Sequence, residues 1–171
     1  MSRIYGAIAV SKILDGGVDT GCQGSVELPE VAFATQDVAG PGIMGTIALP
    51  SAGQFEDMQT TINTRGISAD VLRLHRPGTH ELELRFKQST FMAGSGSALR
   101  LGKAFLTGEY VSGSLGSVET GAVAEGSAVY AVHRMQLLDS DGSELMLIDK
   151  FAHQYRVLGK DHGADIYDGL D

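Results

Sequence analysis

The chain has 171 residues, 43% of them hydrophobic, and a formal net charge of −8. This composition excludes wholesale disorder, and the length fits one domain, residues 1–171, with a sizeable core. The acidic balance argues against a protein that grips nucleic acid through its phosphates, because that requires clustered Lys and Arg.

Cys22 is the only cysteine, so an intrachain disulfide is excluded and a small buried apolar role is expected for it. No run approaches the roughly 18 consecutive apolar residues of a membrane-spanning helix, and the first residues lack a signal-peptide pattern. We therefore expect a soluble protein, made in the cytoplasm, with no cofactor and no membrane segment.

Alternating apolar and polar residues predict a mainly β protein. The expected strands, in chain order, are residues 24–28, 46–49, 58–64, 80–87, 103–111, 128–138 and 144–157. The last run is much longer than the usual 5–6 residues and is expected to break or bend. Asp-Gly at 141–142 predicts the turn of a hairpin that spans residues 126–157.

Two of these strands have one apolar and one polar face. In residues 80–87, Leu82, Leu84 and Phe86 alternate with Glu81, Glu83, Arg85 and Lys87. In residues 58–64, Met58, Thr60 and Ile62 alternate with Gln59, Thr61 and Asn63. Such strands cover a core on one side and meet water, or another chain, on the other.

One helix is expected at residues 69–75. Ser68 is a suitable N-cap, Asp70 lies in the first turn, and Pro77-Gly78 ends the helix. A weaker helical turn is expected at 164–168, and loops at 93–97 and 112–126. The predicted fold is a β-barrel or β-sandwich with one short packed α-helix.

Two patterns suggest chemistry only formally. Residues 40–45 match G-x-G-x-x-G, but Pro41 removes an N–H group and a strand, not a helix, is expected next, so we interpret them as a turn. No G-x-S-x-G motif is present.

The C-terminal His and acidic residues have no metal-site spacing, which favours solvated turns. They are Asp149, His153, Asp161, His162 and Asp165.

Short motifs follow one another across residues 20–165. A Leu-Pro step precedes a Gly-Ile-Met-Gly turn; a glycine-containing strand, an Ile-Asp step and a Gly-x-Asp turn come later. The residues of this pattern are Leu28, Pro29, Gly42, Met44, Gly45, Gly108, Ile148, Asp149, Gly159 and Asp161.

The order and spacing of these motifs resemble the major tail tube proteins of contractile-tailed bacteriophages and R-type tailocins. The chain departs from that family at Ile43, where a second glycine is usual, and at Leu158, where an asparagine is usual. The family's Arg-bearing terminal segment is not reproduced by residues 162–171.

The resemblance implies a tail-tube-like β-barrel subunit without enzymatic activity. It implies hexameric rings that stack into a tube, contact the sheath, tape-measure and baseplate or terminator proteins, and let DNA pass without specific binding. The implied location is the virion tail, with assembly in the host cytoplasm. We predict that Glu81, Glu83, Gln59 and Asn63 face the lumen, and that a loop containing Gly94, Ser95, Gly96 and Ser97 reaches a neighbouring subunit.

Other interpretations stay open at this stage. The same β structure suits the tube of a tailocin, a type VI secretion system or an extracellular contractile injection system. It also suits a monomeric ligand-binding β-barrel. A hydrolase that uses the region of His153 and His162 is the third alternative.

Overall fold

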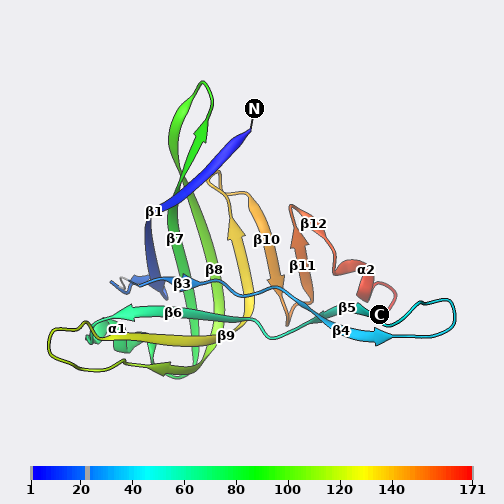
Figure 1. Ribbon diagram of the computed structural model, residues 1–171, viewed down its shortest axis with the longest axis horizontal. Coiled ribbons are helices and arrows are strands. Elements are labelled where there is room, and N and C mark those ends of the chain that lie inside the picture. Colours follow the sequence, from blue (N-terminus) through cyan, green and yellow to red (C-terminus); the bar gives the residue numbers. More distant parts are fainter. Residues whose placement is uncertain (1, 22–23, 171) are drawn as a thin grey trace.

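The computed structural model describes residues 2–21 and 24–170, so Cys22 and the role expected for it lie outside the described residues. Within them, ten strands form one antiparallel sheet, and β4 and β5 form a separate hairpin (Figure 1). The main path of the sheet is β12-β11-β10-β9-β8-β7-β1-β2, and β6 pairs with β9 and β3. No described helix is both long and apolar enough to cross a membrane.

The elements have the following bounds. The strands are β1 (Arg3–Asp15), β2 (Val18–Asp19), β3 (Val26–Glu27), β4 (Phe33–Val38), β5 (Ile47–Phe55), β6 (Gln59–Arg65), β7 (Thr79–Met92), β8 (Gly96–Ser114), β9 (Glu125–Leu138), β10 (Glu144–Asp149), β11 (Gln154–Val157) and β12 (Lys160–Asp161). The helices are α1 (Ala69–Leu74) and α2 (Ala164–Tyr167).

Strand β9 divides the sheet. Its first half pairs with β6 and its second half with β10, while β8 runs along its other side. In Figure 1, β6 and the first half of β9 therefore lie at the bottom and run crosswise to the strands above them. The predicted mainly β fold with a short packed helix is confirmed; the sheet does not close into a barrel, because the end strands β2 and β12 do not pair with each other in the described sheet.

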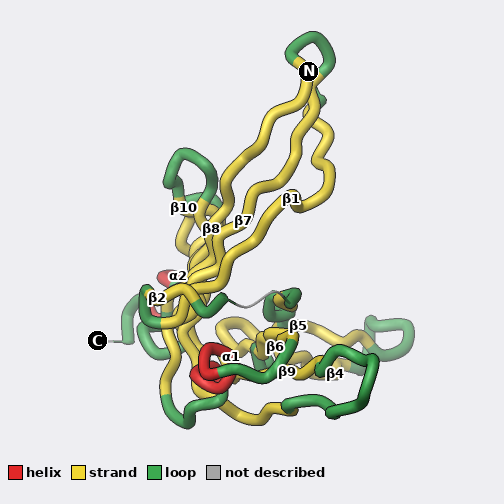
Figure 2. Tube along the Cα trace, turned by 90° about the vertical axis from the view of Figure 1, so that its left-hand side faces the viewer, coloured by secondary structure: helices red, strands yellow, loops and turns green. Residues whose placement is uncertain are grey.

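Three strands extend beyond the body of the molecule. Residues 3–12 of β1, the end of β7 and the start of β8, which together with their turn span residues 85–103, rise as a narrow sheet (Figure 2). We call these residues, 3–12 and 85–103, the projection. The loop expected at residues 93–97 is only the tight turn of this hairpin, since β8 begins at Gly96.

The core lies on one face of the sheet. Tyr130, Ile62 and Ile148 are almost inaccessible to water, and α1 adds Val71 and Leu74. The short helix is confirmed, and the Ser68 hydroxyl accepts a hydrogen bond from the Val71 N–H group at 3.4 Å. With under two turns, this helix depends on its packing against the sheet.

The turn predictions are also confirmed. Gly142 has a φ of 83° in the β9–β10 turn, and the long run at 144–157 breaks between β10 and β11. Residues 40–45 form the connection of the β4–β5 hairpin, and a strand follows them. Strands β1 and β4 were not predicted.

One glycine of the family pattern, Gly108, occupies a position where a side chain would not fit. A Cβ atom on Gly108 would lie 2.5 Å from the carbonyl oxygen of Ala131, at the irregularity in β8–β9 pairing. Only glycine lets the two backbones approach this closely.

Leu158 is strained, and its replacement tests the turn. This exposed residue has a φ of 52°, a conformation that asparagine tolerates much better than leucine. We expect Leu158→Asn to stabilise the protein by about 1 kcal/mol, which thermal unfolding would detect as a rise of about 2–4 °C. Leu158→Ala is the control: it removes the same side chain but keeps the strain, so an equal rise for both variants would contradict the explanation.

Candidate subunit interface

The outer edge of β1 is unpaired over most of its length. Residues 3–13 pair with β7 on one side, whereas β2 pairs only with Leu14 and Asp15. No other strand lies along this edge in the described part of the chain. A long free edge is a template for a strand of another chain unless something covers it.

The projection also exposes apolar side chains. Ile4 and Phe91 are cross-strand partners near the tip and are 61% and 49% exposed. The other large apolar residues exposed on the projection are Tyr5, Ile8, Val10 and Leu99. A group of this kind on one thin element is typical of a surface that meets a protein partner.

The strand register places the predicted lumen residues on one face. Gln59 lies opposite Ala131, and Ala131 lies opposite Glu109. Glu109 in turn lies opposite Thr79 at the start of β7. Because opposed residues and residues two apart share a face, a single sheet face carries Gln59, Asn63, Glu81 and Glu83. We call this the outer face, because the core lies on the other.

The outer face changes charge where the projection begins. Lys12, Arg85 and Lys103 are direct partners across β1, β7 and β8, although opposed like charges destabilise a sheet. Asp19 lies 2.9 Å from the Lys12 Nζ atom, and Glu83 lies 2.6 Å from the Arg85 Nε atom. The hydrogen bond that Arg85 donates to the Glu83 carboxylate raises the pKa of Arg85 above its ordinary value.

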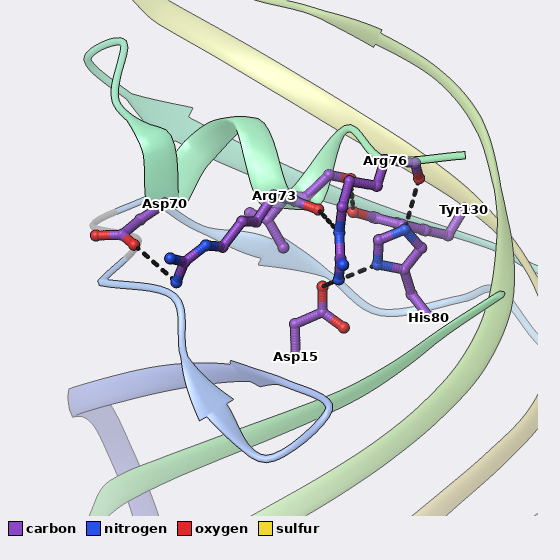
Figure 3. Close-up of polar contacts among 7 residues, drawn as sticks. Asp15, Asp70, Arg73, Arg76, His80 and Tyr130 are labelled. Carbon is purple, nitrogen blue, oxygen red and sulfur yellow. Dashed lines mark hydrogen bonds and ion pairs between the residues drawn. The ribbon is translucent and has the colours of Figure 1, made fainter. Parts of the chain in front are cut away.

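A buried pair of polar side chains, Asp15 and His80, holds β1 against the body. The His80 Nδ1 atom lies 2.9 Å from Asp15 Oδ2, and His80 Nε2 lies 2.7 Å from the Arg76 carbonyl oxygen (Figure 3). Both ring nitrogens thus lie within hydrogen-bond distance of an oxygen atom. The Tyr130 ring packs 5.0 Å from the His80 ring, and its hydroxyl donates to the Leu74 carbonyl.

A second histidine lies near this network. Burial lowers the pKa of His75 below its ordinary value of 6.5. Its Nδ1 atom lies 3.1 Å from the Tyr110 hydroxyl, and its Nε2 atom is buried without a partner in the described structure. His75, the C-cap residue of α1, therefore packs against Tyr110, with ring centroids 5.8 Å apart.

The motif residues near the C-terminus shape turns. The Asp149 carboxylate accepts hydrogen bonds from the N–H groups of Phe151 and Ala152. Asp161 does the same for Gly163 and Ala164. The aspartates of the Ile-Asp and Gly-x-Asp motifs therefore stabilise backbone turns.

An aromatic cleft lies beside these turns. Its volume is about 620 Å³, and Phe33, Phe55 and Tyr155 contact one another at ring distances of 4.9 to 5.9 Å within it. His153 stacks on Tyr167, and no group of three or more metal-binding side chains occurs among the described residues. The two histidines at 153 and 162 therefore line an aromatic cleft and are not arranged as metal ligands.

Comparison with solved structures identifies the fold. A chain of the sheath–tube complex of an extracellular contractile injection system (PVC) in the extended state matches with a TM-score of 0.55 and 10% identity, over 78% of this chain and 91% of that chain. A chain of the sheath/tube terminator of the same system matches with a TM-score of 0.54 and 10% identity, over 77% and 94%. The fold is therefore that of contractile-system tube proteins.

The family follows from the sequence itself. The chain belongs to the family of phage tail tube protein FII, whose model matches residues 9–169. A search among curated proteins gives no match. The resemblance seen in the short motifs is thus confirmed, and the protein is a tail tube protein.

The Asp15–His80 pair is expected to contribute more to the free energy of unfolding than the exposed Lys12–Asp19 pair of the β1–β2 hairpin. Asp15→Ala leaves the buried Nδ1 atom of His80 without its hydrogen-bond partner, so we expect a loss of about 2 kcal/mol in the free energy of unfolding. The control is Asp19→Ala, which removes an exposed partner of Lys12 and is expected to cost at most about 1 kcal/mol. Urea unfolding measures both, and equal losses would contradict the role of the buried pair.

Proposed function

We propose that the chain is the inner-tube subunit of a contractile phage tail, acting as one structural unit that forms hexameric rings. The rings stack into a tube inside the sheath and meet tape-measure and baseplate or terminator proteins. The tube is assembled in the host cytoplasm, belongs to the virion tail and conducts DNA during genome ejection. The family match over residues 9–169 carries this proposal.

The open sheet supports a role in self-assembly. The free edge of β1 and the exposed apolar residues of the projection would be liabilities on a solitary protein. In a closed ring, neighbouring copies cover such edges, which removes the liability. The proposed role is structural and needs no catalytic group.

The outer face supports the position of the lumen. It carries the polar side chains of Gln59, Asn63, Glu81 and Glu83, the last between Leu14 and Phe105, and these polar groups suit water and an anionic polymer that must slide past without binding. We propose that this part of the face lines the hole. The fold likeness to an injection-system tube favours one alternative, a tube whose cargo is protein.

Electron microscopy tests the function. The purified chain is expected to form rings or long hollow rods, and a helical reconstruction is expected to place Glu81 and Glu83 on the inner wall. Solitary particles of 18.0 kDa at every salt and protein concentration would overturn the proposed function. Rods with these two residues on the outer wall would overturn only the lumen assignment.

Shortening the projection tests its role in polymerisation. Deleting Gly94, Ser95, Gly96 and Ser97 leaves the register of Ser89 with Leu99 intact, because an even number of residues is removed at the turn. We expect a folded chain with an unchanged circular dichroism spectrum that no longer forms tubes. Tube formation at the normal level would show that the tip contacts no neighbour.

A further inference from the structure

Two regions of the chain carry charges of one sign only. The projection, residues 3–12 and 85–103, holds six of the 13 Lys and Arg residues and none of the 21 Asp and Glu residues. Residues 13–64 hold seven Asp and Glu residues and no Lys or Arg. A protein with a net charge of −8 therefore carries a purely basic element.

Four of the six basic side chains of the projection lie on the outer face, since Arg3 and Arg100 are partners of Met92 and Gln88 on the other face. Lys87 is two residues from Arg85, and the row of Lys12, Arg85 and Lys103 crosses the same face. Lys87 and Lys103 form no ion pair within the described residues. We call Lys12, Arg85, Lys87 and Lys103 the cationic row.

Apolar residues flank the cationic row on the same face. Val10 is the cross-strand partner of Lys87, and Leu99 is the partner of Ser89. Both are more than half exposed, like Ile4 further along. A water-filled hole or a nucleic-acid backbone gives such side chains nothing to pack against, whereas a protein surface does.

An acidic surface on the same chain has the complementary charge. Glu27, Glu30, Glu56 and Asp57 are exposed, and none forms an ion pair in the described structure. The Glu56 N–H group donates to the Ala32 carbonyl at 2.9 Å, which brings the two segments of this acidic patch together. A cation near the patch, the Lys150 ammonium, donates to the Glu56 carbonyl oxygen.

The acidic patch cannot reach the cationic row of its own chain. Val26 and Leu28 line a cleft of about 510 Å³ with Ile8, Leu84 and Phe86 at the base of the projection, whereas Glu27 is the partner of Thr61 and points to the other side of β3. Those three residues lie on the core side of the sheet, opposite the cationic row. The core thus lies between the row on β7 and Glu27 on β3, so complementary contact requires two molecules.

We propose that the cationic row of one copy docks on the acidic patch, Glu27, Glu30, Glu56 and Asp57, of a second copy. The inference rests on the proposed function, and it identifies the contact between successive rings. Row and patch are different surfaces, so the contact is head-to-tail and can repeat without end, as a stacked tube requires. The lumen then ends near Glu83, where the charge of the outer face changes.

A charge-swap experiment tests the contact. Lys87→Glu with Lys103→Glu is expected to reduce sedimentable tubes by about tenfold or more, because it opposes like charges. Glu56→Lys with Asp57→Lys is expected to do the same. A chain with all four substitutions is expected to regain tubes, since the attraction is restored with reversed sign.

The control variant is Arg65→Glu with Lys160→Glu, which changes the net charge equally at exposed sites outside row and patch. It is expected to form tubes normally, and all variants are first checked for unchanged thermal unfolding. Tubes from Lys87→Glu with Lys103→Glu at the normal level would overturn the contact but leave the proposed function standing. If these variants form tubes in normal amounts but the tubes retain less DNA, the cationic row faces the hole, and this result also overturns the proposed contact. Failure of the unmodified chain to assemble would instead sink the proposed function.

Discussion

The unbroken pairing of β7 with β8 is the constraint on which the rest of the structure depends. Thr79 lies opposite Glu109 at one end of this hairpin and Met92 lies opposite Gly96 at the other, with no shift of register between them. The ladder satisfies the backbone groups along its whole length. The hairpin can therefore leave the core without losing its hydrogen bonds, and it does so after Phe86.

This continuity explains why the sheet stays open. The near half of the hairpin covers the core with Leu82 and Leu84, whereas the far half has no core beneath it. Strand β1 follows the hairpin outward, so its free edge is carried away from β12 at the other end of the sheet. Closure within one chain would require the projection to fold back on itself.

The buried pair of Asp15 and His80 lies where β1 meets the body. It connects the end of β1 to the start of β7 and, through the Arg76 carbonyl, to the segment after α1. Buried polar groups are costly to leave without a hydrogen-bond partner, so these contacts hold the base of the projection in one position. A rigid base lets the projection present the same surface to every partner.

The sequence by itself determined the local elements. Alternation at residues 80–87, the Ser68 cap, the Asp-Gly turn and the break after Asp149 are each set by neighbouring residues, and all are present in the structure. The alternation also indicated correctly that Glu81 and Glu83 share a face with Gln59 and Asn63.

Only the tertiary structure decided the rest. Strand β1 was missed because register shifts near Ile8 break the period of two and because its apolar residues point to both faces. The cationic row was invisible because Lys12, Arg85 and Lys103 come from three strands, and only their pairing makes them neighbours. Local pattern fixes which way a side chain points along one strand, whereas long-range pairing fixes what lies beside it.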